Sequence, residues 1–287
     1  MGIELGILLA FGALICWGFG DFFIQRSTRK FGSWETLFII SSFATIVLFP
    51  FIYRDLAILS KKEILVLLIA SSCILFAALF NFEGLKKGKL AIIEPIFVIE
   101  VPISILLAFF IINEVIDSTG LILIAILVIG LILVSLKDHF TKRRWLEKGV
   151  ILAIIGSIFM GSANFFFGLG SRITNPLIIN WFVSIFLAVI CFVYLVLNKK
   201  IKKLVLDVKK NKRLVLSLNI FDNGAWIFYA FAALFAPIGI VVAISESYIV
   251  LAVLLGLIIN KERLMKHQKF GLIISIISAI ALALKYS

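Results

Sequence analysis

The sequence predicts an all-α membrane protein whose ten transmembrane helices form two inverted repeats of five helices each. Three observations lead to this prediction: the composition, a series of long apolar stretches, and an internal repeat. Of the 287 residues, 62% are hydrophobic and 15% are charged, against roughly 45–50% apolar and 25% charged residues in an average soluble domain. The composition therefore excludes a soluble enzyme, a secreted disulfide scaffold, a disordered chain and a nucleic-acid-binding protein as first interpretations.

Ten apolar stretches approach the roughly 20 residues that a helix needs to cross the hydrocarbon core of a bilayer. In chain order we expect spans at residues 3–25, 33–53, 63–84, 90–112, 119–136, 148–170, 175–197, 214–236, 238–259 and 270–284. Runs such as 122–136 are apolar on every side, which fits helices and not the alternating strands of a membrane barrel. The first span lacks a basic flank and a small-residue cleavage site, so we expect it to be retained and not removed as a signal peptide.

The breaks between the spans contain the basic residues and mark where each span ends. The breaks after the first, third, fifth, seventh and ninth spans hold 23 of the 28 Lys and Arg residues, and the opposite side holds 5. Cytoplasmic loops are enriched in Lys and Arg, so this bias predicts a multi-pass plasma-membrane protein with both termini outside. The net charge of +12 then indicates orientation and contact with the anionic lipid bilayer, not with nucleic acid.

The second half of the chain resembles the first at an offset of 143 residues. GILLA at 6–10 aligns with GVILA at 149–153, and WGFGDFF at 17–23 aligns with MGSANFF at 160–166. Chance similarity of apolar segments is the alternative, but the matched Gly and Asp/Asn positions recur in the same order. We predict one repeat at 1–140 and another at 146–287. Because each holds five spans, an odd number, the second must be inverted, as is typical of secondary transporters.

Acidic residues lie within the spans, where no Lys or Arg accompanies them. The six acids at membrane depth are Asp21, Glu83, Glu94, Glu100, Asp222 and Glu246. A carboxylate at the bilayer centre costs at least ~2.5–3.5 kcal/mol, so such a group is a functional hypothesis by default. Without basic partners, the deeper acids must be protonated, hydrogen-bonded to neutral groups, or matched to an external cation. This pattern favours protons, amines or organic cations over an anionic substrate.

Polar and aromatic residues at three- and four-residue spacing extend this candidate site along several helices. An aromatic face beside a carboxylate suits an ammonium group through cation–π attraction. The candidate substrate-binding residues are Trp17, Asp21, Glu100, Asn164, Asn180, Asp222, Asn223, Trp226, Tyr229, Glu246 and Tyr248. The asparagines have an alternative role, which is to hydrogen-bond helices to one another. The Trp and Tyr residues have an alternative role as anchors at the membrane interface.

Other polar residues have structural interpretations. We expect Glu83 to pair with Lys86 or Lys87. Glu94 directly precedes Pro95, and we expect it to hydrogen-bond backbone groups that a helix kink leaves unpaired. Glu114 and Glu262 are expected in loops as solvated ends of spans.

No metal site, cofactor or catalytic residue is predicted. Cys16, Cys73 and Cys191 lie singly in three spans, and His139 and His267 lie in basic breaks. These residues have neither the spacing of metal ligands nor that of a nucleophile and its base.

The ten spans, Trp17-Gly18, Glu100, the pair Asn113-Glu114 and Glu262 together resemble the EamA-type transporters of the drug/metabolite transporter superfamily. The resemblance covers essentially the whole chain, although Asn113 stands where the family usually has Gly. It implies a central cavity lined by spans one to four and six to nine, with both termini inside, opposite to the charge bias. It also implies export of amino acids or other amine-bearing compounds, with multidrug or organic-cation efflux as the alternative.

One motif favours an enzyme instead. GFGD at 18–21 matches the GxGD pattern of intramembrane aspartyl proteases, with Asp222 as a second aspartate, although the two motifs stand in the reverse order here. A lipid flippase or a receptor without coupled transport is a third hypothesis. We predict a secondary active transporter of a small molecule that works by alternating access, with protons as a candidate coupling ion.

Overall fold

The structure is a computed structural model, and it describes residues 2–56, 59–87, 96–136, 148–251, 254 and 264–286. Within these residues the chain is helical and contains no strand. The helices are α1 Gly2–Lys30, α2 Ser33–Ile52, α3 Lys61–Lys87, α5 Glu100–Ile112, α6 Ser118–Ser135, α7 Lys148–Ile173, α8 Pro176–Leu197, α9 Ile201–Lys210, α10 Lys212–Phe235, α11 Ile238–Ser245 and α13 Lys266–Tyr286. The prediction of an all-α protein is confirmed.

Eight of these helices are long and apolar enough to cross a membrane, namely α1, α2, α3, α6, α7, α8, α10 and α13. Helices α5 and α11 are apolar but shorter. They occupy parts of the fourth and ninth expected spans, of which residues 90–95, 252–253 and 255–259 lie outside the described residues. Helix α9 was not expected, because its segment has the composition of a basic break. The chain is a multi-pass helical membrane protein.

Local chemistry explains two of the sharp connections between spans. Gly32 joins α1 to α2 with φ 116°, a conformation that residues with a side chain rarely adopt. At the start of α8, the Asn175 side chain accepts a hydrogen bond of 2.8 Å from the Leu177 amide. Pro176 follows in the first turn, where its missing N–H costs nothing. These residues end one span and begin the next within a few positions.

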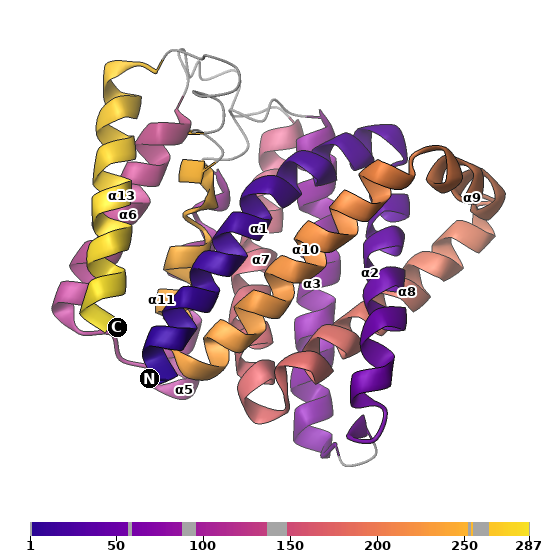
Figure 1. The fold of residues 1–287 in the computed structure, drawn as a ribbon, viewed down its shortest axis with the longest axis horizontal. Coiled ribbons are helices and arrows are strands. Elements are labelled where there is room, and N and C mark those ends of the chain that lie inside the picture. The colour runs from indigo at the N-terminus through magenta and orange to yellow at the C-terminus, as the bar shows by residue number, and fades with distance from the viewer. Residues whose placement is uncertain are drawn as a thin grey trace.

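The two halves of the chain pack against each other along most of their helices. Helix α1 packs along α10, α3 along α7, α2 along α8 and α6 along α13. In each pair one helix comes from residues 2–136 and its neighbour from residues 148–286. Figure 1 shows α6 and α13 paired at one side of the molecule, away from α2, α3 and α8, with both termini at the same end of the bundle. The core is therefore shared between the two halves.

Asp117, just before α6, ties this helix to the end of α13. Its carboxylate lies 2.7 Å from the Lys285 ammonium and accepts a hydrogen bond from the Tyr286 hydroxyl. The bond to Lys285, and then the one to Tyr286, lowers the pKa of Asp117 from 3.8 to about 2. Because the folded-state pKa is depressed, the contact stabilises the fold above about pH 4, and this contribution is lost as the pH falls through about 2.

We therefore expect Asp117→Asn to reduce the acid sensitivity of the fold. Between pH 4 and pH 2 the unfolding temperature of the variant should fall less than that of the wild type, because the variant has no carboxylate to protonate. The difference should be modest, since exposed ion pairs contribute little. Thermal scans of the detergent-solubilised protein would measure it, and parallel losses in both proteins would contradict the expectation.

Candidate functional site

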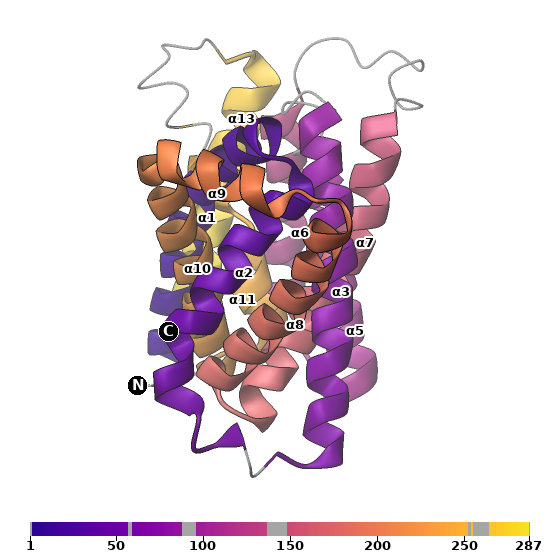
Figure 2. The same cartoon turned by 90° about the vertical axis from the view of Figure 1, so that its right-hand side faces the viewer.

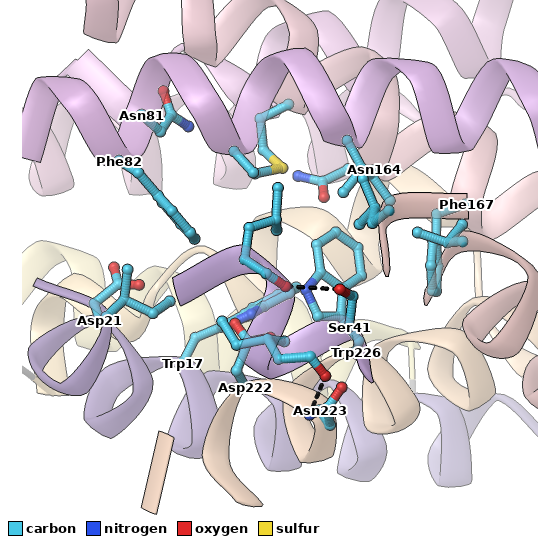
Figure 3. Close-up of a pocket in the computed structure, with 18 of the residues that line it drawn as sticks. Trp17, Asp21, Ser41, Asn81, Phe82, Asn164, Phe167, Asp222, Asn223 and Trp226 are labelled. Atoms are coloured by element: carbon cyan, nitrogen blue, oxygen red, sulfur yellow. Dashed lines mark hydrogen bonds between the residues drawn. The ribbon is translucent and has the colours of Figure 1, made fainter. Parts of the chain in front are cut away.

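A cavity of about 120 Å³ lies among helices from both halves of the chain (Figure 3). Its volume is several times the roughly 10–15 Å³ that one buried water needs. Its polar lining consists of Asp21, Ser41, Asn81, Glu100, Asn164, Asn180, Ser184, Asp222, Asn223, Glu246 and Tyr248. None of the described residues that line it is Lys, Arg or His. The cavity thus combines four carboxyl groups with neutral polar groups.

Two of the four carboxyl groups sit at interruptions of apolar helices. Glu100 is the first residue of α5, directly after a turn at residues 98–99, and Glu246 follows the last residue of α11, where a second turn begins. Their side chains are buried, at 4% and 5% exposure. Broken helices are tolerated at membrane depth only where protein or a cavity accommodates the freed backbone groups. Both interruptions therefore point to the cavity as a place where polar chemistry is concentrated.

Asn164 of α7 links these two carboxyl groups. Its side-chain amide lies 3.3 Å from a Glu246 oxygen and 3.5 Å from a Glu100 oxygen. Its backbone carbonyl accepts a hydrogen bond of 2.8 Å from the Tyr229 hydroxyl. One neutral donor is thus shared between two acids that repel each other electrostatically. This sharing leaves room for a proton or a cation to complete the site.

The other two carboxyl groups, Asp21 of α1 and Asp222 of α10, belong to the same electrostatic cluster. Asp21 hydrogen-bonds the Tyr248 side chain and repels Asp222, Glu100 and Glu246. Figure 3 shows Asp21 and Asp222 on the side of the cavity opposite Asn81 and Asn164. Like charges confined together favour a bound positive charge or shared protons. The arrangement is therefore chemically suited to cations.

Aromatic rings line the cavity beside these acids. Trp17 and Trp226 meet edge to face with ring centroids 5.3 Å apart, and Phe167 lies 4.6 Å from Trp226. Tyr229 packs against both tryptophans but is fully buried and does not line the cavity. In this structure Tyr229 stands behind the pocket, where its hydroxyl donates to the Asn164 backbone carbonyl.

All the other candidate residues line this one cavity. Asn180 and Asn223 also link helices, because their amides donate to the Trp226 and Ile40 carbonyls of neighbouring helices, each at 3.5 Å. Sequence reasoning missed Asn81 as a lining residue. A single amide within the third apolar span was the signal that could have identified it.

The expectation that Glu114 is solvated is wrong. Its carboxylate lies 2.8 Å from the Arg172 guanidinium, and its side chain is 11% exposed. Arg172 also donates to the Ala233 and Ala236 carbonyls at 2.6 and 2.7 Å, and Glu114 accepts from the Gly239 amide at 3.1 Å. The pair therefore joins the ends of α7 and α10 to the start of α11, satisfying backbone groups that helix ends leave unpaired.

Asn113 explains how Glu114 reaches this position. It ends α5 in the left-handed conformation, with φ 51° and ψ 35°. Glycine adopts this conformation most readily and asparagine follows it. Asn113 thus suits the place where glycine is usual in the family that the sequence resembles.

The remaining acids have separate outcomes. Glu83 accepts a hydrogen bond of 2.8 Å from Ser33 and pairs with Lys86 at 3.3 Å, which confirms the predicted pairing. Glu94, Pro95 and Glu262 lie outside the described residues.

Comparisons with known proteins agree with this architecture. The model of the EamA-like transporter family matches the chain twice, over residues 4–136 and 147–284. An uncharacterised protein from Methanocaldococcus jannaschii, MJ1333.1, is 26% identical over 139 residues, which make up 47% of this chain and 97% of that protein. A solved crystal structure superposes with a TM-score of 0.72 at 13% identity, covering 98% of this chain and 97% of the other. This last likeness shows the fold alone.

The family matches together span nearly all of the chain, and eight of the described helices are long and apolar enough to cross a membrane. The proteins of this family are transporters and not enzymes. The chain therefore belongs to the EamA-like transporter family, within the drug/metabolite transporter superfamily.

Proposed function

We propose that this protein is a secondary active transporter that exports amino acids or other small amine-bearing metabolites, with protons as the coupling ion. The observation that supports this most is the convergence of four carboxyl groups on one cavity whose described lining contains no basic side chain. Such a site binds positive charge and repels anions such as sugar phosphates. The tryptophans add a cation–π surface for an ammonium group.

We infer further that the two halves are inverted repeats that alternate access to the cavity. The pairing of the helices supports this. Helix α1 packs along α10, and α7, which is the counterpart of α1 in the second half, packs along α3 in the same way. The M. jannaschii relative also supports it, since almost its whole length matches about half of this chain. Glu100 and Glu246 stand at helix interruptions in the fourth and ninth spans, which are corresponding places in the two repeats. Interrupted helices in corresponding positions mark the substrate site in many secondary transporters.

Efflux of organic cations is the second candidate function, and the aromatic lining favours it. Trp17, Phe167 and Trp226 form a cluster that would also accept a quaternary ammonium compound, which donates no N–H hydrogen bond. Primary amines would instead use the carboxyl oxygens as acceptors. Preference between these two classes of cation distinguishes metabolite export from multidrug efflux.

An uptake screen in vesicles containing the purified protein tests the proposal. Amino acids, polyamines, quaternary ammonium compounds and sugar phosphates would each be supplied with and without a pH gradient. We expect accumulation of amines, increased by the gradient, and none of sugar phosphates. Accumulation of the anions alone would contradict the proposal, and binding without substrate-dependent proton movement would favour a receptor.

A further inference from the structure

A second concave surface lies at the basic end of the bundle, where α1, α9 and α10 meet. This basic groove has a volume of about 500 Å³. It is lined by Phe23, Arg26, Lys30, Lys209, Lys210, Asn211, Lys212, Arg213, Leu214 and Ser217. Six of these residues are basic and none is acidic. It is separate from the acidic cavity, with which it shares no lining residue.

The positive charge of the basic groove is not neutralised by the described part of the chain. Elsewhere at the same end, Lys86 pairs with Glu83 and Lys200 with Glu35. Among the described residues, none of the six basic groove residues forms such an ion pair. Lys30 instead donates a hydrogen bond to the Asn211 side chain, which fixes the end of α1 beside the α9–α10 junction. The charges are therefore held together by the fold despite their mutual repulsion.

Helix α10 adds to this positive potential. Lys212 and Arg213 occupy its first turn, where the unpaired amides of a helix already carry partial positive charge. Basic residues at this end disfavour the helix unless an anion is nearby. An anion bound in the basic groove would relieve the repulsion among the basic side chains at this helix end.

Helix α9, whose last two residues line the basic groove, has the features of a helix at a membrane interface. Figure 2 shows α9 lying across the end of the bundle and not along it. Leu204 is buried against the bundle, whereas Val205 and Leu206 are 47% and 58% exposed. A helix with apolar residues and lysines in this orientation is typical of the membrane interface. Phe23 and Leu214 give the groove an apolar part, suited to the glycerol and first methylenes of a lipid.

We propose that the basic groove binds the phosphate headgroup of an anionic phospholipid. Phosphate oxygens accept hydrogen bonds from Lys, Arg and the Ser217 hydroxyl, and basic pockets between membrane helices are suited to such headgroups. The lipid would join the end of α1 to the start of α10, two helices that also carry Asp21 and Asp222. The proposal does not depend on what the acidic cavity transports.

Titration of the purified full-length protein with phosphatidylglycerol and, separately, phosphatidylcholine tests this site, with lipid adducts counted by native mass spectrometry. The groove variant combines Lys209→Gln, Lys210→Gln, Lys212→Gln and Arg213→Gln. The matched control combines Lys202→Gln, Lys203→Gln, Lys266→Gln and Lys269→Gln, which remove the same charge at the same end but outside the groove. A second groove variant, Arg26→Gln with Lys30→Gln, removes the basic residues on the α1 side of the groove. It serves as the test if the first variant does not fold.

We expect the wild type to prefer phosphatidylglycerol, and either groove variant that folds to bind it at least about tenfold more weakly. The affinity of the control variant for phosphatidylglycerol should change by less than about twofold. Equal losses in groove and control variants would overturn the proposal in favour of general surface electrostatics. Inorganic phosphate would also be added at the molar concentration of the lipid and at constant ionic strength. If it displaced the lipid, the proposal would be overturned in favour of a free-phosphate site.

Discussion

The triple variant Glu100→Gln, Asp222→Asn and Glu246→Gln is expected to lose amine transport, with flux at least about 100-fold below wild type. Each carboxylate that contacts an ammonium contributes a charge-assisted hydrogen bond worth about 1.5–3 kcal/mol. Their electrostatic effects also reinforce one another within a buried cavity. Neutral amides keep the shape of the side chains, so the loss would report charge and not packing. Uptake into vesicles at matched protein content measures it.

The matched control combines Asp55→Asn, Glu63→Gln and Asp207→Asn. These substitutions remove the same three negative charges from residues that do not line the cavity, so transport should stay near the wild-type rate. Both proteins must show the same size-exclusion profile, which separates lost function from lost folding. Wild-type flux in the cavity variant would remove the three acids from the transport mechanism.

The second large effect is expected from Arg172→Gln, on stability. The Arg172 guanidinium makes three contacts of 2.6 to 2.8 Å, because its nitrogens donate to the Glu114 carboxylate and to the Ala233 and Ala236 carbonyl oxygens. Glutamine would leave Glu114 partly buried without its counter-charge. We expect a loss of about 2–3 kcal/mol, seen as a fall of about 5–10 °C in unfolding temperature.

Lys86→Gln provides the comparison for this prediction. It breaks the pair with Glu83, in which the Lys86 side chain is 41% exposed, so about 0–1 kcal/mol should be lost. Glu114→Gln, alone and combined with Arg172→Gln, completes a double-mutant cycle that isolates the coupling between the two residues. Equal small shifts for the Arg172 and Lys86 variants would show that the Arg172 network does not stabilise the fold.

Much of the fold could be predicted because hydropathy is a strong signal over twenty residues. The second span was expected at 33–53 and observed as Ser33–Ile52, and the sixth at 148–170 and observed as Lys148–Ile173. Helix α9 was missed because it is only 10 residues long and alternates apolar residues with lysines. In such a short segment, composition indicates a basic break as readily as an interfacial helix.

The charged residues of the candidate site could be predicted from the sequence. Carboxyl groups in apolar spans are costly, so Asp21, Glu100, Asp222 and Glu246 could be singled out without a structure, and all four line one cavity. The burial of individual side chains and their contact partners could not be predicted. Tyr229 follows Trp226 at helical spacing, yet neighbouring helices bury it behind the pocket, and Glu114 meets an arginine that is 58 positions away in the sequence.

Equilibrium binding of cations to the acidic cavity tests the central claim most directly. The best amine from the uptake screen and its uncharged N-acetyl analogue would be titrated into the purified wild-type protein, with the fluorescence of Trp17 and Trp226 in the cavity as the reporter. We expect the amine to bind at least about tenfold more tightly, since each charge-assisted hydrogen bond is worth about 1.5–3 kcal/mol. Equal or tighter binding of the uncharged analogue would contradict a cavity built for cations.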